Sequence, residues 1–237
     1  MLSVENVSSG YGKLQILTDV SVTAVESQVT VVVGPNGSGK STLLKTIAGL
    51  TNIYQGRVTC DGQTISNLPS HLIARAGIAY LPQTDSTFTQ LKVRENISMA
   101  AYTVPSSDFE ARLKDVVELF PQISKYMESK VVNLSGGERQ MVAMAMALMR
   151  KPKVIMFDEP TANLSPKLAT EVLKTVESVA KDLHLTVLLV EQNAKKALEM
   201  GDMAFLLVGG KKAFEGAAGE LLSHGELAQL YLGLKTQ

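Results

Sequence analysis

Residues 29–44 read VTVVVGPNGSGKSTLL: a β-branched run stops at a glycine-rich turn, and a helical pattern begins at Lys40. This is the pattern G-x-x-x-x-G-K-[ST] between a strand and a helix, the context that a phosphate-binding loop requires. Its glycines let backbone N–H groups converge on an anion, and the helix N-terminus adds the positive end of its dipole. The stretch therefore predicts a nucleotide phosphate site, made by Gly34, Pro35, Asn36, Gly37, Ser38, Gly39, Lys40, Ser41 and Thr42.

Three side chains of this loop have chemistry of their own. We expect Lys40 to neutralise β- and γ-phosphate oxygens and the Ser41 hydroxyl to bind Mg²⁺. We expect Thr42 to contact the nucleotide on the side of its α- and β-phosphates. With average residue usage, the bare pattern occurs by chance in about 1 in 100 chains of this length. A plain glycine-rich turn before an ordinary helix is therefore a poor alternative.

The composition excludes several classes of protein. The chain has 237 residues, with 23 Lys and Arg against 23 Asp and Glu, so no basic excess points to a nucleic-acid partner. The single cysteine, Cys60, rules out an internal disulfide and fits a reducing compartment. The longest apolar run, residues 141–149, is about half of the roughly 20 residues that span a bilayer. We expect a cytoplasmic chain, free or peripheral to a membrane.

Strand patterns alternate with helical patterns along most of the chain. We expect strands at residues 2–7, 20–25, 29–33, 56–62, 78–81, 153–157, 186–190, 204–208 and 212–215. Ser66 or Asn67 is expected to cap a short helix that carries Leu72 and Ile73. Strands that alternate with helices predict an α/β fold with a mostly parallel central sheet.

One segment, residues 84–133, has a different character. Strand signals vanish there, helical spacing dominates residues 93–101 and 109–120, and Pro105 and Pro121 punctuate it. We interpret this segment as an inserted helical subdomain. The chain would then be one domain, 1–237, with a core made of residues 1–83 and 134–237.

An acidic pair follows the predicted strand at residues 153–157. Residues 154–160 read VIMFDEP, and ligands bind at the carboxyl end of such strands. Asp158 suits a Mg²⁺ shell, directly or through water. Glu159, on the opposite side of the pleat, can polarise a water for in-line attack on a γ-phosphate. A solvated turn with two acids is the plainer alternative.

A second glycine pair lies in residues 134–140, which read LSGGERQ. Ser135 is suited to cap a helix, and the backbone of Gly136 and Gly137 can approach a phosphate closely. An ordinary serine cap with glycines would look the same in isolation. Together with the phosphate loop and the acidic strand, the stretch resembles the signature of ABC-type ATPases. The resemblance covers nearly the whole chain and implies a P-loop NTPase of ABC type, with an antiparallel β subdomain beside the parallel sheet.

The resemblance also implies an ATP site shared between subunits. In ABC ATPases two domains pack head to tail, so Ser135, Gly136 and Gly137 would contact the γ-phosphate of the ATP that the partner binds. Gln83 matches the Q-loop glutamine, which would meet Mg²⁺ and the attacking water; a polar loop residue is the plainer alternative. Tyr11, which we place in a loop, matches the aromatic that stacks on adenine, unless it packs on the sheet.

Two positions depart from the general family pattern. Ser165 stands where the family has an Asp, and Gln192 stands where it has a His. Gln192 can donate to a γ-phosphate oxygen or accept from water, but it cannot carry charge or transfer a proton at neutral pH. The alternatives are an inactive site and a subfamily that uses this pattern, and we favour the subfamily.

The subfamily that this chain resembles is the ATPase of branched-chain (hydrophobic) amino acid importers. The resemblance lies in VEQNA at residues 190–194, in LSP at 164–166, and in the closing stretches GELL and YLG. Asn163 stands where that subfamily often has Gly. A related solute such as urea is an alternative cargo. A soluble ABC ATPase of DNA repair or translation is a further alternative, which the length and charge balance disfavour.

We therefore expect an ATP-hydrolysing subunit with ATP and Mg²⁺ as cofactors. Lys40, Glu159 and Gln192 would be catalytic, while Ser41, Gln83 and Asp158 would hold the metal. The expected partners are membrane permease subunits, a solute-binding protein that acts indirectly, and a second, non-identical ATPase subunit that carries the missing His. The chain would lie on the inner face of the cell membrane, with a docking groove in residues 84–133.

Overall fold

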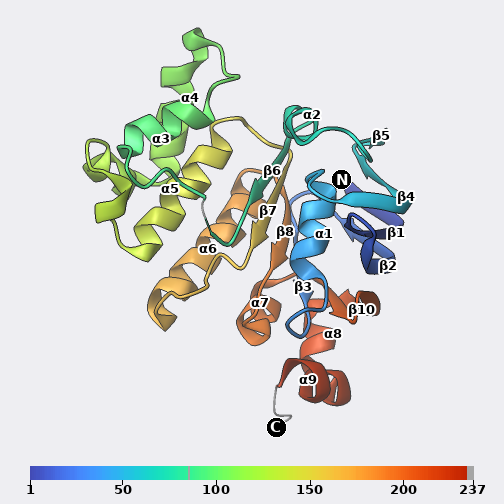
Figure 1. Ribbon diagram of the computed structural model, residues 1–237. Helices are drawn as coiled ribbons and strands as arrows, with labels where there is room; N and C mark the ends of the chain where they lie inside the picture. The colour runs from blue at the N-terminus through green and yellow to red at the C-terminus, as the bar shows by residue number, and fades with distance from the viewer. Residues whose placement is uncertain (85, 234–237) are drawn as a thin grey trace.

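The computed structural model describes residues 1–84 and 86–233, and its centre is a six-stranded sheet (Figure 1). The strands lie in the order β10-β9-β3-β8-β7-β6, and every neighbouring pair is parallel except β9 and β10. They are β3 (Val29–Val33), β6 (Ile78–Leu81), β7 (Val154–Asp158), β8 (Thr186–Val190), β9 (Met203–Val208) and β10 (Lys211–Ala217). The mostly parallel α/β sheet predicted from the sequence is confirmed.

The middle strands of this sheet are covered on both faces. Every residue of β3, β7 and β8 is buried, as expected of continuous apolar strands inside a parallel sheet. Val31 packs in one hydrophobic cluster and its neighbour Val32 in another, on the opposite face. Because β3 and β7 both run parallel to β8, their carboxyl ends meet at one edge, where the phosphate loop and Asp158 follow.

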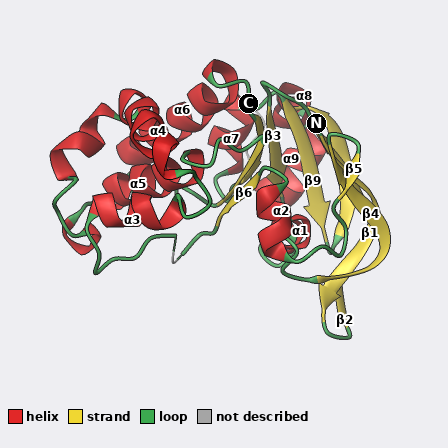
Figure 2. Ribbon diagram, turned by 90° about the horizontal axis from the view of Figure 1, so that it is seen from above, coloured by secondary structure: helices red, strands yellow, loops and turns green. Residues whose placement is uncertain are grey.

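A second, antiparallel sheet confirms the predicted β subdomain. It has the strand order β2-β1-β4-β5 and lies at the end of the molecule away from α3 and α4 (Figure 2). Its strands are β1 (Leu2–Tyr11), β2 (Leu14–Ala24), β4 (Asn52–Cys60) and β5 (Gln63–Thr64). Helix α1 (Lys40–Ile47) joins the two sheets, because Leu43, Leu44 and Ile47 share a cluster with residues of both.

The hairpin of β1 and β2 corrects the expected loop around Tyr11. Tyr11 is the last residue of β1 and pairs with Leu14, so only Gly12 and Lys13 are left for the turn. Register shifts interrupt β1 after Val4. They break the alternation of buried side chains while the ladder continues, which is why the sequence pattern ends too early.

Helices dominate the side of the molecule that carries residues 86–148 (Figure 1). They are α3 (Val93–Ala100), α4 (Ser106–Leu119), the 3₁₀ turns η1 (Pro121–Tyr126) and η2 (Val131–Asn133), and α5 (Gly136–Leu148). Helix α5 packs on α3 and α4 and also on β6, so it connects this helical layer to the central sheet. The subdomain bounds at 84 and 133 stay a prediction, and residues 85 and 234–237 lie outside the described residues.

The remaining helices bring one correction. They are α2 (Ser70–Arg75), α6 (Pro166–Asp182), α7 (Ala194–Met200), α8 (Ala218–Ser223) and α9 (Gly225–Leu232). The predicted cap of α2 is wrong, because the helix begins after Pro69, while the Ser66 hydroxyl accepts the N–H of Val58 at 2.6 Å and Asn67 has φ 62°. Ser165 caps α6, its hydroxyl oxygen accepting the Leu168 N–H at 3.4 Å. No described helix combines the length and the apolar character that crossing a bilayer takes.

Candidate active site

The phosphate loop joins β3 to α1 and borders a cavity of about 490 Å³. Loop residues 36–42 line it, together with Gln83 after β6, Glu159 after β7 and Gln192 after β8. Ile16 of β2 completes the wall. The structure thus brings together residues from four separate stretches that the sequence predicted to meet.

Glycine is required in the loop for a steric reason. Gly37 and Gly39 have φ of 77° and 100°, backbone conformations that side chains strain. A Cβ at Gly34 would lie 2.1 Å from the carbonyl oxygen of Leu207. The loop can therefore wrap tightly beside β9 only with these glycines in place.

Lys40 lies inside the loop, with 5% of its surface exposed. Its Nζ donates to the carbonyl oxygens of Gly34 at 2.9 Å and Pro35 at 3.0 Å. Burial lowers the pKa of Lys40, and the nearby carboxylates of Glu159 and Asp158 oppose that shift. The ammonium group is thus held by acceptors that an incoming phosphate could replace.

Asp158 is a buried carboxylate fixed from two sides. Its Oδ1 accepts from the Ser41 hydroxyl at 2.8 Å, and its Oδ2 accepts from the Tyr80 hydroxyl at 3.0 Å. No group of three or more His, Cys, Asp or Glu side chains that could hold a metal occurs among the described residues. Mg²⁺ is commonly held by one or two carboxylates plus substrate phosphates, so the hydroxyl and carboxylate oxygens of Ser41 and Asp158 fit it.

Glu159 lies just beyond β7, where its φ of 49° turns the chain out of the strand. Its Oε2 accepts from Gln83 Nε2 at 2.9 Å. Burial raises the pKa of Glu159, Lys40 lowers it, and Asp158 raises it further. A carboxyl group with a raised pKa beside a phosphate site is suited to accept a proton from water.

Gln192, which follows β8, lines the same cavity. Its Nε2 lies 3.5 Å from Asn36 Oδ1, and the side chain is exposed. The residue stands immediately before the Asn193 cap of α7, which fixes the backbone at this point. The amide can therefore face a phosphate, as the sequence predicts for a donor at this position.

Gly34, Pro35 and Asp158 adjoin residues that line this cavity without lining it themselves, and four further predicted site residues lie apart from it. Tyr11 stands at the end of the β1–β2 hairpin, 43% exposed, and does not line it. Ser135 caps α5 in a box with Glu138, whose Oε2 accepts the Ser135 N–H at 2.7 Å. Gly136 and Gly137 follow in the first turn and face α6 and the loop before it. Within one chain the predicted site residues therefore lie in three places: at the cavity, at the end of the β1–β2 hairpin, and at the start of α5.

The structure adds residues that the sequence did not single out. Tyr80 stands on the same face of β6 as Ile78 and bonds Asp158 on the neighbouring strand. Period-two alternation before Gln83 could have indicated it. Glu191 is buried beside Gln192, and Ile16 lines the cavity from β2. Neither has a local sequence signal that would identify it.

Comparison with protein families decides the class. A family model described as ABC transporter matches residues 17–162, more than half of the chain. The chain belongs to the ABC transporter family. ABC proteins of known structure share its fold: a nucleotide-free ATP-binding cassette superposes with a TM-score of 0.86 at 26% identity, covering 97% of each chain. A cassette in its ADP conformation gives 0.86 at 27% identity, again over 97% of each chain.

Three ABC relatives that match along nearly the whole chain are transport proteins. The "Probable branched-chain amino acid transport ATP-binding protein LivF" of Archaeoglobus fulgidus is 49% identical over 99% of both chains. The high-affinity branched-chain amino acid transport ATP-binding protein BraG of Pseudomonas aeruginosa is 37% identical over 98% of this chain and 100% of its own. The lipopolysaccharide export system ATP-binding protein LptB of Haemophilus influenzae is 32% identical over 98% and 97%. This chain is accordingly an ABC ATPase that binds ATP and couples its hydrolysis to transport.

Proposed function

We propose that this chain is the ATP-hydrolysing subunit of an importer for branched-chain or other hydrophobic amino acids. The observation that carries the proposal is the full-length similarity to two branched-chain amino acid transport proteins, at 49% and 37% identity. The similarity to a lipopolysaccharide export protein is lower, at 32%. The glutamine at position 192 agrees with this choice, because the VEQNA stretch resembles that importer subfamily.

The cavity geometry supports a role for each residue around the nucleotide. Lys40 and the amides of the glycine loop neutralise the phosphates. Ser41, Asp158 and Gln83 hold Mg²⁺, which supplies positive charge against the phosphate oxygens when it is bound. Glu159 accepts the proton of the attacking water, and Gln192 donates to the γ-phosphate. Tyr11 offers a ring for the adenine once the nucleotide extends past the cavity.

The division of the predicted residues supports pairing with a second ATPase subunit. Ser135, Gly136 and Gly137 lie outside the cavity that contains the phosphate loop. Ser135 is exposed and Gly136 is half-buried, so these two can face the site of a partner, whereas Gly137 is buried under Leu168. The capping box holds this helix start rigid before any partner binds. We infer a head-to-tail pair, with a non-identical partner that carries the His that Gln192 replaces.

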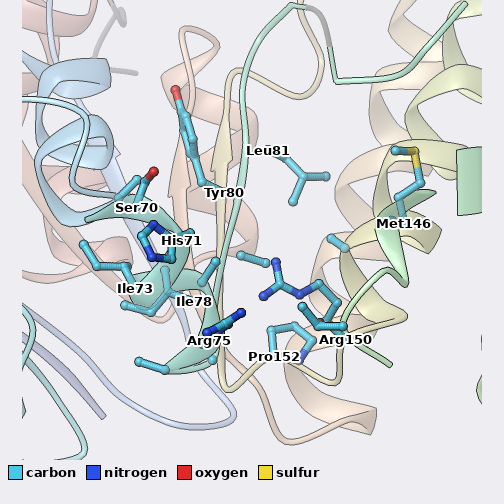
Figure 3. Close-up of a pocket in the computed structure, with 18 of the residues that line it drawn as sticks. Ser70, His71, Ile73, Arg75, Ile78, Tyr80, Leu81, Met146, Arg150 and Pro152 are labelled. Carbon is cyan, nitrogen blue, oxygen red and sulfur yellow. The ribbon is translucent and has the colours of Figure 1, made fainter. Parts of the chain in front are cut away.

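A groove of about 1120 Å³ supports docking of a permease (Figure 3). It runs between α2 and β6 on one side and α5 with the segment after α3 on the other. The docking groove was expected in residues 84–133, but most of this lining comes from residues 48–82 and 143–153. Ile73, Ile78, Leu81 and Met146 give it an apolar lining. We infer that a short cytoplasmic helix of a membrane subunit occupies this groove, which would place the chain on the inner membrane face.

The charges of the groove define the chemistry of that helix. Five cations line it and no carboxylate does among the described residues: Arg75, Arg112, Arg150, Lys151 and Lys153. Arg112, Lys151 and Lys153 are paired with Asp108, Asp115 and Asp61, which leaves Arg75 and Arg150 outside the ion pairs of the described chain. Arg75 comes from the end of α2 and Arg150 from the turn that follows α5 (Figure 3). Such a surface favours an apolar helix that carries an acidic side chain, because opposite charges steer and orient docking.

Reconstitution tests the proposed function. The chain is assembled with permease subunits and a second ATPase encoded beside it, in liposomes, with the matching solute-binding protein outside. We expect leucine or isoleucine to stimulate ATP hydrolysis several-fold, as expected when a loaded binding protein drives closure of the ATPase pair. The proposed cargo would be contradicted if urea or lipopolysaccharide stimulated ATP hydrolysis and no amino acid did.

A further inference from the structure

Glu191 is a buried carboxylate to which none of the roles above applies. It follows β8, and 2% of its surface is exposed. Its Oε1 accepts the backbone N–H of Thr161 at 3.1 Å, and its Oε2 accepts the backbone N–H of Gln192 at 3.2 Å. None of the ion pairs within the described part of the chain includes it. The Thr161 side chain also hydrogen-bonds the carboxylate. A carboxylate is costly to bury unless its oxygens are satisfied, so these contacts account for its place.

The first contact attaches Glu191 to the loop that follows Glu159. In that loop the Glu159 N–H donates to the Val190 carbonyl at 2.9 Å, and the Ala162 N–H donates to the Glu159 carbonyl at 3.1 Å. Thr161 lies between these two bonded positions. The carboxylate of Glu191 therefore holds the loop on the end of β8, beside the proposed base.

The same loop ends against the start of α5. A Cβ at Gly136 would lie 2.7 Å from Leu164 Cδ2, so the leucine packs closely over this glycine. Leu168, in the first turn of α6, covers Gly137 in the same way, at 3.1 Å. The contacts thus run from Gln192 through Glu191 and Thr161 along the loop to Leu164 and Gly136.

We propose that Glu191 is a positioning residue that links Gln192, at this chain's own phosphate cavity, to the loop that supports Gly136 at the other half-site. The inference rests on the proposed function, in which those two regions serve two different ATP molecules. A carboxylate is needed because both partners are donors: a glutamine offers one acceptor oxygen and turns an amide N–H₂ toward the second donor. Movement of the Gln192 backbone on ATP binding is then carried to the start of α5.

Amide hydrogen exchange in the full-length chain without partners tests the link directly. We compare Glu191→Gln and Glu191→Ala with Glu199→Gln, a control on α7 whose side chain is 51% exposed. We expect the Thr161 and Gln192 amides to exchange about tenfold faster in Glu191→Gln and faster still in Glu191→Ala, since each loses hydrogen bonds to a charged acceptor. ATP binding should stay within about twofold of wild type in all three. Unchanged exchange in both Glu191 variants would overturn the proposal.

Steady-state kinetics of the assembled transporter separate positioning from plain structural support. We expect kcat to fall about tenfold in Glu191→Gln and about a hundredfold in Glu191→Ala, with KM for ATP nearly constant. A raised KM at constant kcat would overturn the proposal. The exchange measurement uses the chain without partners, so it tests the role of Glu191 whatever solute the transporter carries. If amino acids do not stimulate ATP hydrolysis by the wild-type complex, the proposed function is contradicted, but the exchange result for Glu191 remains valid.

Discussion

Asp158 illustrates how single side chains prepare this site. A hydroxyl from α1 and a hydroxyl from β6 donate to its two oxygens, so the carboxylate has one orientation before a metal arrives. Such supporting hydrogen bonds commonly tune a metal ligand. Burial beside Asp158 raises the pKa of Tyr80, so its hydroxyl stays a donor throughout the neutral range. Ser41 can turn to Mg²⁺ while Tyr80 keeps the carboxylate in place.

Replacing Tyr80 by Phe should therefore weaken Mg²⁺ use. A hydrogen bond to a charged group is worth about 1.5–3 kcal/mol, so we expect the Mg²⁺ concentration for half-maximal ATP hydrolysis to rise about tenfold. Tyr54→Phe is the matched control, since its hydroxyl bonds carbonyls at the β1–β2 turn. Direct titration with Mn²⁺ in the presence of ATP provides the second measurement. An unchanged metal dependence would remove Tyr80 from the site.

Asp61 gives a pH-dependent contribution to stability. It lies between the α-amino group of Met1 and Lys153, both at 2.8 Å. The hydrogen bond from Lys153, followed by that from Met1, lowers its pKa from 3.8 to about 2. Since the folded pKa is depressed, the stabilisation is complete above pH 3.8 and is lost as the pH falls through about 2.

Asp61→Asn should thus lower the free energy of unfolding at pH 7 by no more than about 1 kcal/mol, because these groups are largely exposed. Urea unfolding measures this change in the free energy of unfolding, with Glu118→Gln as the control at an exposed residue. The deficit should shrink between pH 4 and pH 2. A deficit of the same size at pH 2 would show that Asp61 acts by other means.

At the scale of elements, the buried strands were the most predictable. Residues 29–33 and 186–190 match β3 and β8, because burial on both faces leaves a continuous apolar run. Residues 78–81 match β6, an edge strand whose first and last residues are buried. The exposed hairpin at Tyr11 and the start of α2 were not predicted correctly. Bulges in β1 and the proline at position 69 shift these boundaries, and neither leaves a periodic signal in the sequence. Glu191 and Tyr80 depend on contacts between strands, which local patterns do not contain.

The groove between α2 and α5 provides an element-scale prediction. Arg150 lies 5.6 Å over the Tyr102 ring and lines the groove, so Arg150→Glu would repel an acidic docking helix. We expect binding to the permease to weaken at least about tenfold, with nucleotide binding by the chain unchanged. Lys114→Glu, on α4 and outside the groove lining, is the matched control. An equal loss of permease affinity in both variants would show that the net charge of the chain matters and not the position of Arg150 in the groove.

For the whole molecule, the separation of Ser135–Gly137 from the phosphate cavity makes catalysis a property of the assembly. The chain without partners should be monomeric or weakly dimeric and should hydrolyse ATP at least about tenfold more slowly than the complete transporter. Analytical ultracentrifugation with ATP and Mg²⁺, together with phosphate release, measures both. A stable homodimer at full activity would contradict the inferred non-identical partner.

Glu159 tests the central claim that this cavity hydrolyses ATP. Glu159→Gln keeps the size of the side chain and the contact with Gln83 but cannot accept a proton from water. Single-turnover hydrolysis by the assembled complex, with ATP affinity measured in parallel, is the most direct experiment. We predict ATP binding within about twofold of wild type and hydrolysis slower by about a hundredfold or more. Hydrolysis at the wild-type rate would contradict the assignment of the site.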